Sequence, residues 1–252
     1  MKKFWKVLSR ILIGLVIIAL IVGAGGTFYL KSYLPNTVAK KSFPQIDGEI
    51  KIAGLDGPVD IYRDQMGIPH IYASTQHDLF FAQGYVHAQD RFWQMDFWRH
   101  TGSARLSEMF GKKQVSTDAF LRTLGWRQIA EKEYEMLSPE AKATADSFTE
   151  GVNAYIKDRT PVEISLEYSI LGLLTPSYKI EPWTPVNSLT WGKAMAWDLG
   201  GNMSTEIERA VLLKTLTPEQ VAELFPAYPS DYPVIVPVIG ENAGGVESLK
   251  SK

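Results

Sequence analysis

The side chains most able to carry acid–base chemistry lie on one stretch of the chain, residues 76–100. It holds His87, Asp90, Arg91 and Arg99. An imidazole oriented by a carboxylate can act as a general base, and a guanidinium can bind an anion, so a catalytic His–Asp–Arg group is one interpretation. The other is a structural network, because unpaired buried charges are very costly and interleaved opposite charges usually pair with each other. We favour the structural network.

No self-sufficient catalytic motif accompanies these residues. The sequence has no G-x-S-x-G elbow, no H-E-x-x-H pair, no EF-hand loop and no phosphate-binding loop. His70 lies in a strand pattern and His77 close to a helix start, where a packing or capping role is commoner than metal ligation. No particular serine is indicated as a nucleophile.

Two short alternating runs precede this stretch and predict a β-hairpin. Residues 58–63 and 68–73 alternate β-branched and aromatic side chains with polar ones, and 64–67 supply turn residues between them. The alternation at 50–53 predicts a further strand within 46–55, which we expect to join the hairpin in one antiparallel sheet.

A long helix should follow the hairpin, with Ser74, Thr75 or Asp78 as its cap. Apolar residues recur along it at helical spacing. They cover so much of the helix surface that we expect it to be buried on more than one side. They are Phe81, Tyr85, Ala88, Phe92 and Met95, flanked by Leu79, Ala82, Val86 and Trp93.

The second half of the chain reads as a series of shorter helices. Ser138 and Pro139 form a helix start, with serine as cap and proline at the first helical position. We also expect a short helix within 102–111 and a turn through Phe120 and Leu124 that Asp118 caps. Further helices are expected over 128–137, 186–199 and 206–216. Thr205 and Glu208 form a capping box that opens the last of these, and Thr217 and Gln220 form another such box.

The N-terminus carries a membrane-type signal. Lys2, Lys3, Lys6 and Arg10 precede residues 11–30, which contain no charge. About 20 apolar residues span a bilayer, and the basic flank favours translocation of the remainder of the chain. The span is either an uncleaved signal anchor, which its length favours, or a signal peptide cut near residues 23–26. Residues 31–44 then read as a juxtamembrane linker broken by prolines.

Composition excludes several classes. The chain has 252 residues, 45% hydrophobic and 21% charged, with a formal net charge of −2. This balance gives no support for nucleic-acid binding, which requires a basic face. Cysteine is absent, so disulfides, thiolate zinc sites and cysteine nucleophiles are excluded. Seven tryptophans indicate an aromatic-rich core or an apolar pocket.

Several motifs in a fixed order carry a family resemblance. GIPHIYAST, FAQGYVHAQDRFWQMDFWR, GSARLSEMFG and DAFLRTLG together resemble the α-chain region of the penicillin acylase family, N-terminal nucleophile amidohydrolases made as precursors. The resemblance covers residues 46–225. It is specific for the family and weak for the substrate.

The resemblance implies an α+β, helix-rich fold, the α-chain portion of a four-layer αββα sandwich. It divides the chain into a signal anchor or signal peptide with linker (1–35), the α-chain region (36–225) and a Pro/Gly-rich tail or start of a spacer peptide (226–252). In this family the nucleophile is the first serine of the β-chain, whose own α-amino group serves as base. We therefore expect no catalytic residue in this chain and no activity from it alone.

Three residues match positions to which the family gives a role. Glu206 matches an α-chain glutamate that helps bind a structural calcium ion shared with the β-chain; the alternative is that it only stabilises the first turn of a helix. Met195 and Leu199 lie near the positions that line the acyl pocket, and ordinary core packing is the alternative. The sequence Trp197 to Gly201 departs from the aromatic pocket helix of penicillin G acylases, which argues against phenylacetyl specificity.

Two functional hypotheses follow. The first is the α-subunit of an enzyme that hydrolyses the C–N bond of a linear amide, in penicillin-like or other N-acyl substrates, with N-acyl-homoserine lactones as an alternative substrate. Its partners are a β-chain, a small-molecule amide and a membrane through residues 11–30, in a membrane-anchored, extracytoplasmic location, or a secreted or periplasmic one after cleavage. The second is a membrane-tethered, non-catalytic accessory or binding protein.

Overall fold

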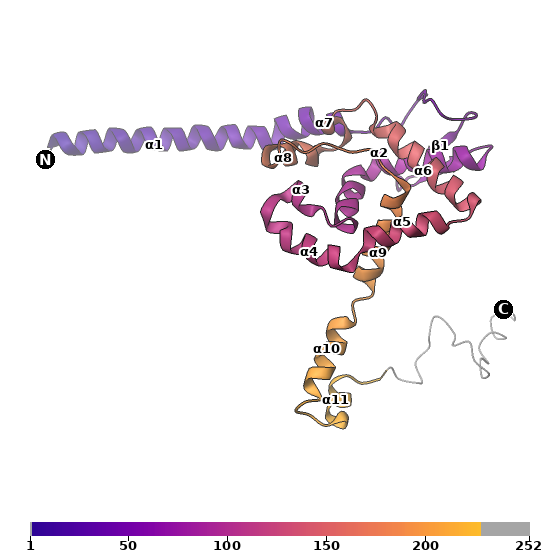
Figure 1. Ribbon diagram of the computed structural model, residues 1–252. Helices are drawn as coiled ribbons and strands as arrows, with labels where there is room; N and C mark the ends of the chain where they lie inside the picture. Colours follow the sequence, from indigo (N-terminus) through magenta and orange to yellow (C-terminus); the bar gives the residue numbers. More distant parts are fainter. Residues whose placement is uncertain (1, 228–252) are drawn as a thin grey trace, which may run out of the picture. The chain divides into compact units, whose positions relative to one another are not determined.

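The structure is a computed structural model, which describes residues 2–227. The chain forms two compact units, Met1–Asp198 and Leu199–Lys252. The predicted tail over 226–252 lies almost wholly outside the described residues. The first unit holds most of the helices together with a single two-stranded sheet (Figure 1).

The N-terminal apolar segment is helical throughout. Helix α1 (Lys2–Phe28) continues as a π-helix, η1 (Tyr29–Val38), and a 3-10 turn, η2 (Ala39–Ser42). One candidate membrane span is found among the described residues, Phe4–Ser42, and it qualifies by length and composition. The predicted linker over 31–44 is therefore wrong up to Ser42. Pro35 lacks an N–H donor, and the wider π-helix accommodates it.

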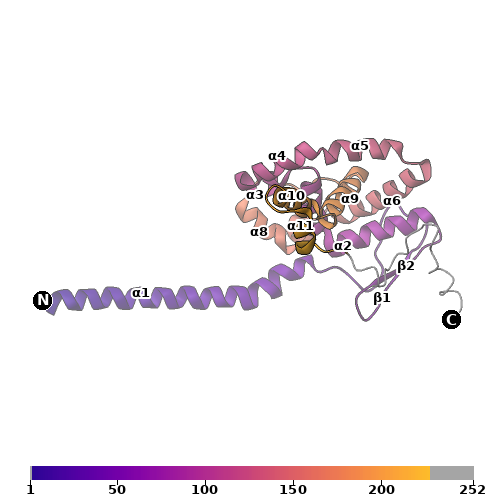
Figure 2. The ribbon, with the colours of Figure 1, turned by 90° about the horizontal axis from the view of Figure 1, so that it is seen from below.

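The hairpin prediction is confirmed. Strands β1 (Asp60–Arg63) and β2 (Pro69–Tyr72) pair antiparallel, with Ile61 opposite Ile71. Figure 2 shows the hairpin beside α2. Arg63 of β1 donates two hydrogen bonds, of 2.8 and 2.9 Å, to the carboxylate of Asp90 in α2. The third strand predicted within 46–55 is wrong, because the sheet has two strands only. That segment turns at two glycines with positive φ, Gly48 and Gly54, which interrupt the extended backbone.

Helix α2 (Gln76–Gly102) is the central element, and Thr75 caps it by accepting a hydrogen bond from the Asp78 backbone N–H at 3.0 Å. Its buried residues include those of the predicted apolar stripe, from Phe81 to Phe92. At Arg91 the backbone leaves helical geometry (φ −144°, ψ 20°), so α2 is kinked.

Helix α6 (Pro139–Ile156) begins as predicted, with the Ser138 hydroxyl accepting from the Ala141 N–H. It packs along α2 at very close range. A Cβ added to Gly151 would lie 1.8 Å from the Phe81 carbonyl oxygen, and one added to Gly84 would lie 2.0 Å from that of Phe148. Only glycine allows the two backbones to meet in this way.

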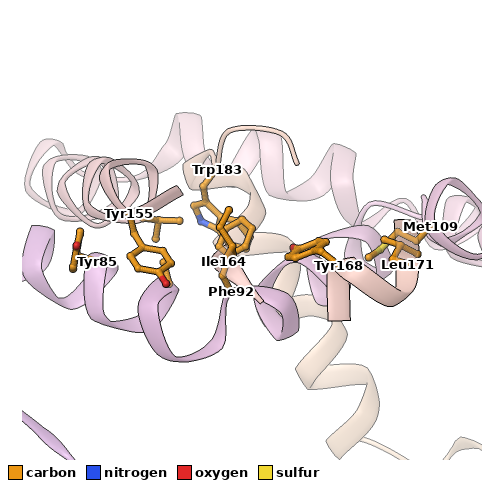
Figure 3. Packing of buried hydrophobic residues seen from close by; sticks show 10 residues of the cluster. Tyr85, Phe92, Met109, Tyr155, Ile164, Tyr168, Leu171 and Trp183 are labelled. Carbon is orange, nitrogen blue, oxygen red and sulfur yellow. The ribbon is translucent and has the colours of Figure 1, made fainter. Parts of the chain in front are cut away.

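The main hydrophobic core fills the space between α2, α6 and the segments that follow them. Figure 3 shows its aromatic residues, in which Tyr85 and Tyr155 meet edge to face with ring centroids 5.4 Å apart. Such pairs stabilise beyond the area they bury. The core residues are Tyr85, Ala88, Phe92, Met109, Val152, Tyr155, Ile164, Tyr168, Leu171 and Trp183.

Three helices connect α2 to α6: α3 (Leu106–Phe110), α4 (Val115–Leu124) and α5 (Trp126–Met136), with a 3-10 turn η3 (Gly111–Gln114) after α3. The predicted role of Asp118 is corrected. Its buried carboxylate lies within α4 and accepts the N–H groups of Leu106 and Ser107, both at 2.8 Å. It therefore caps α3, which precedes it in the chain.

Three further helices of the first unit follow α6. The stretch 160–176 forms α7 (Pro161–Ile164) and α8 (Leu166–Leu174). Helix α9 (Pro185–Leu199) begins at Pro185, one residue before the predicted 186–199.

The second unit contains α10 (Met203–Leu212) and α11 (Pro218–Leu224). The Thr217/Gln220 capping box opens α11 as predicted. The predicted Thr205/Glu208 box is wrong, because α10 starts at Met203 with Asn202 before it and ends four residues before Leu216. Within this unit Val221 is buried and the Arg209 guanidinium lies over the Phe225 ring at 5.0 Å.

Candidate functional site

Helix α9 carries the predicted acyl-pocket residues, and the first unit holds it firmly. Arg127 of α5 donates to the Asn187 side-chain oxygen at 3.0 Å, and Lys193 forms an ion pair with Glu133. The rings of Trp98 and Trp191 lie 4.6 Å apart. These contacts fix the position of α9 against α2 and α5.

The two predicted acyl-pocket residues lie one helical turn apart in α9. Met195 is half-buried, next to the fully packed Ala194. Leu199 is 76% exposed at the end of the helix. The Leu199 side chain therefore belongs to no core within the described residues.

A wide apolar groove of about 950 Å³ lies between α2, α6 and the start of α9. This volume is in the range of small-molecule sites. Its walls are mainly the apolar side chains of Phe80, Met95, Trp98, Phe148, Leu189 and Trp191, with His87 and Arg91 among the polar ones. Neither Met195 nor Leu199 lines it, so the groove and the predicted acyl-pocket residues are separate features.

The charged residues singled out on α2 do not form a catalytic group. His87 and Arg91 are exposed, and Asp90 pairs with Arg63 of the hairpin. Arg99 alone of the four is buried, with its Nε 2.6 Å from Asp96. The structural interpretation is therefore correct for Arg99, but with partners other than those expected.

The network around Asp96 is the part that sequence reasoning missed. The fully buried carboxylate of Asp96 accepts from the hydroxyls of Tyr168 (2.5 Å) and Tyr178 (2.6 Å) as well as from Arg99. His100 Nδ1 lies 2.7 Å from the Asp96 carbonyl oxygen. The spacing of Asp96, Arg99 and His100 at i, i+3 and i+4 was the signal available in the sequence.

Electrostatics keeps Asp96 ionised in this network. Burial by itself raises the pKa of a carboxyl group, but the hydrogen bond from His100, the charge of Arg99 and the bond from Tyr168 outweigh it and bring the pKa of Asp96 to about 2. Burial and the neighbouring carboxylate raise the pKa of both Tyr168 and Tyr178, so the two phenols remain donors. The network is an ionic clamp that joins α2 to the 166–182 segment.

Glu206, the predicted calcium ligand, lies exposed in the first turn of α10. A free carboxylate suits a hard cation, which prefers oxygen ligands, but calcium takes six to eight of them. Among residues 2–227 the one grouping of potential metal ligands is Asp56, His77 and Asp78, which excludes Glu206. Glu206 thus has the right chemistry for one ligand of a calcium site.

The histidine rings that form hydrogen bonds in the described residues have carboxylate or carbonyl partners. Within residues 2–227, the hydrogen bonds of histidine rings go to Asp64, Asp78, Glu150 and the Asp96 carbonyl, and none goes to a serine or threonine hydroxyl. A triad requires such a contact. The geometry is that of a helical scaffold with an apolar groove and an exposed apolar helix end.

Comparison with a solved structure places this scaffold in a class. The chain is similar to the thermostable penicillin G acylase from Alcaligenes faecalis, with a TM-score of 0.56 and 24% identity. The match covers 73% of this chain and 98% of the solved one. This likeness shows that the helix-rich fold is that of a chain of a penicillin G acylase.

The sequence comparisons give the family. The penicillin amidase family profile matches residues 58–251, and the chain belongs to that family. It is 37% identical over 148 residues to penicillin acylase 2 proenzyme of Pseudomonas sp. (strain SE83), covering 59% of this chain and 18% of the relative. It is 34% identical over 204 residues to the acyl-homoserine lactone acylase QuiP of Pseudomonas aeruginosa PAO1, covering 80% and 23%. The chain thus spans about a fifth of the length of these curated relatives.

Proposed function

We propose that this chain is the α-chain part of an acylase that hydrolyses linear amides, with its nucleophile on a separate β-chain region. The observation that carries the proposal is the pattern of coverage. The chain matches a fifth of a proenzyme-length relative but nearly the whole of one chain of a solved penicillin G acylase. The residues matched in this chain therefore correspond to one chain of such an enzyme.

In the proposed enzyme the two parts have different tasks. The β-chain supplies an N-terminal serine, whose own amino group takes the proton as the hydroxyl attacks the amide carbonyl. This chain supplies the scaffold and apolar contacts to the acyl group, within a four-layer αββα sandwich to which it gives helices and a hairpin.

The substrate class is an N-acyl compound with an apolar acyl group. Two kinds of relative support it, one named for penicillin and one for acyl-homoserine lactone. An N-acyl-homoserine lactone and a penicillin both present a linear amide next to a strained or lactone ring.

The proposal is tested by turnover of the assembled enzyme. The precursor that contains both this chain and its β-region should hydrolyse N-acyl-homoserine lactones or penicillin-type amides. This chain alone should not hydrolyse either. Amine release across short, long and aromatic acyl groups is the measurement. An assembled pair inactive on every acyl group would instead favour a non-catalytic accessory protein.

Substitutions at the predicted acyl-pocket residues test where the acyl pocket lies. In the assembled enzyme, Met195→Ala and Leu199→Ala should each lower kcat/KM for the preferred acyl group about tenfold, because one or two lost methylene contacts are worth about 1–3 kcal/mol. Short acyl groups, which do not reach these side chains, should be affected less. Met136→Ala and Leu173→Ala are matched controls, since both side chains are more than 80% exposed in other helices; an equal loss in the controls would remove the assignment.

We further propose that Glu206 contributes one carboxylate to a structural calcium site completed by the β-chain. Calcium would add fixed positive charge between the two chains when bound. Glu206→Gln should weaken calcium binding by the assembled enzyme about tenfold or more, because calcium affinity follows the number of charged ligands. The readout is the rise of Tm on adding calcium after chelation. Glu208→Gln, an exposed glutamate of the same helix, should retain the full rise.

Residues 11–30 are proposed to take the chain to the extracytoplasmic side, either as an anchor or as a cleaved signal. The apolar helix α1, none of whose membrane-length window is buried, supports this placement. Alkaline extraction of membranes, followed by N-terminal sequencing, separates the two: an anchored chain stays in the pellet with its first residues, and a cleaved one begins after residues 23–26.

A further inference from the structure

The start of α2 holds a compact group of ligand-type side chains. Nδ1 of His77 lies 3.0 Å from an oxygen of Asp78 and 3.7 Å from one of Asp56. The ligand atoms of the three residues all lie within 4.8 Å of one another. They come from two segments, the loop before β1 and the first turn of α2, that meet at this point.

We propose that Asp56, His77 and Asp78 bind a divalent transition-metal ion of the zinc type. Zinc bonds of about 2.0–2.2 Å to nitrogen and oxygen place tetrahedral ligand atoms about 3.3 Å apart. The two distances from His77 Nδ1 bracket this separation. One imidazole with two carboxylates is a donor set that zinc accepts, and water completes the coordination.

The charge around His77 favours a cation. Three carboxylates face this one ring, because Glu150 of α6 lies 3.3 Å from its Nε2. Among the described residues, the ion pairs of Asp56, Asp78 and Glu150 are with His77 alone, so no lysine or arginine compensates them. Even with His77 protonated, the group carries two excess negative charges. A divalent ion brings it close to neutrality.

The surroundings also orient the ligands as metal sites require. The Asp78 carboxylate is 1% exposed and is fixed by the backbone N–H groups of Asp56 (2.9 Å) and Gly57 (3.1 Å). Glu150 accepts from Nε2 of His77, which leaves Nδ1 to face the two aspartates. Carboxylates that hold the far nitrogen of a ligand histidine set its tautomer and raise its basicity.

A metal ion here would have a structural role. It would fasten the loop 54–57 to α2, and through Glu150 to α6, next to the close crossing of the two helices. Binding replaces the proton on Nδ1, which passes to solvent. The site is independent of the proposed amide hydrolysis, so metal binding and acylase activity can fail separately.

The test uses the full 252-residue chain, purified in a nonionic detergent and stripped of metal with a chelator. Calorimetry with Zn²⁺ should give one saturable site per chain, and Co²⁺ should give visible bands of a tetrahedral complex. At a zinc concentration 100-fold above Kd, Tm should rise by about 5 °C or more. Circular dichroism confirms that each sample is helical before titration.

Two variants and one control locate the site. Asp56→Asn and His77→Gln should each weaken zinc binding at least tenfold; both side chains are partly exposed, so the fold should persist. Asp78 is left intact because its carboxylate holds the loop. His70→Gln removes an exposed histidine that also lies beside an aspartate, Asp64 at 3.3 Å, and should bind zinc normally. Absence of saturable binding to the folded chain, or binding unchanged in either variant, overturns the site.

Discussion

Replacing Gly151 by alanine should destabilise the chain by about 3–5 kcal/mol. The added methyl carbon would lie 1.8 Å from the Phe81 carbonyl oxygen and 2.9 Å from the Tyr85 nitrogen. Overpacking in a core usually costs 1–3 kcal/mol, because side chains move aside. Here the neighbours are backbone atoms of α2, so the two helices must separate, and that opens the core along Tyr85, Val152 and Tyr155.

The loss should appear as a lower Tm and a lower midpoint of chemical denaturation. Gly172→Ala is the matched control, because nothing lies within 4 Å of a Cβ at this position in α8. It should stabilise by up to about 1 kcal/mol, the difference in helix propensity between the two residues. If both variants melted together, the close approach of α2 and α6 would be refuted.

Gly84 lies on the other helix of the same crossing, and replacing it by alanine should have a related effect. A Cβ at Gly84 would lie 2.0 Å from the Phe148 carbonyl oxygen, in the same helix crossing. Gly84→Ala and Gly151→Ala should therefore not be additive, because helices already separated by the first methyl group accommodate the second at smaller cost. The double variant should be less destabilised than the sum of the single ones.

The sequence predicted those elements whose signals are local. The hairpin follows from alternation on either side of residues 64–67, and α6 from Ser138 followed by Pro139. Both predictions are confirmed because capping and turn chemistry are completed within a few residues. The strand expected within 46–55 failed for a related reason: the alternation extends over only four residues, and glycines at 48 and 54 turn the chain on both sides.

Contacts between distant segments could not be predicted in this way. Asp118 has the residue type of a cap, but the helix it caps is decided by the fold, which brings it to Leu106. Asp56 and His77 are 21 positions apart, and their proximity depends on Asp78 holding the loop. Of the residues assigned from the family resemblance, Met195 is half-buried, while Leu199 and Glu206 are exposed. Their roles therefore stay predictions about the assembled enzyme.

Replacing Asp96 by asparagine should cost about 3–5 kcal/mol of stability. Removing one partner of a buried ion pair leaves the other charge uncompensated, here Arg99 at 3% exposure. The amide also provides a weaker acceptor for Tyr168 and Tyr178, which both donate to one carboxylate oxygen. Asp90→Asn is the control: its pair with Arg63 is partly exposed, so the loss should stay below about 1 kcal/mol.

The pH dependence of stability shows whether Asp96→Asn acts through loss of the Asp96 charge or through a general loosening of the core. The pKa of Asp96 is about 2 in the folded chain, below the ordinary 3.8, so its ionisation stabilises the fold above about pH 4. That stabilisation, about 2 kcal/mol, is lost as the pH falls from 4 through 2, because the unfolded chain takes up the proton first. Asp96→Asn has no such proton to bind. Its stability should therefore fall less steeply over that interval than that of the wild-type chain, whereas a variant that merely loosened packing would show the wild-type slope. Denaturation midpoints measured at pH 2, 3, 4 and 6 decide between the two.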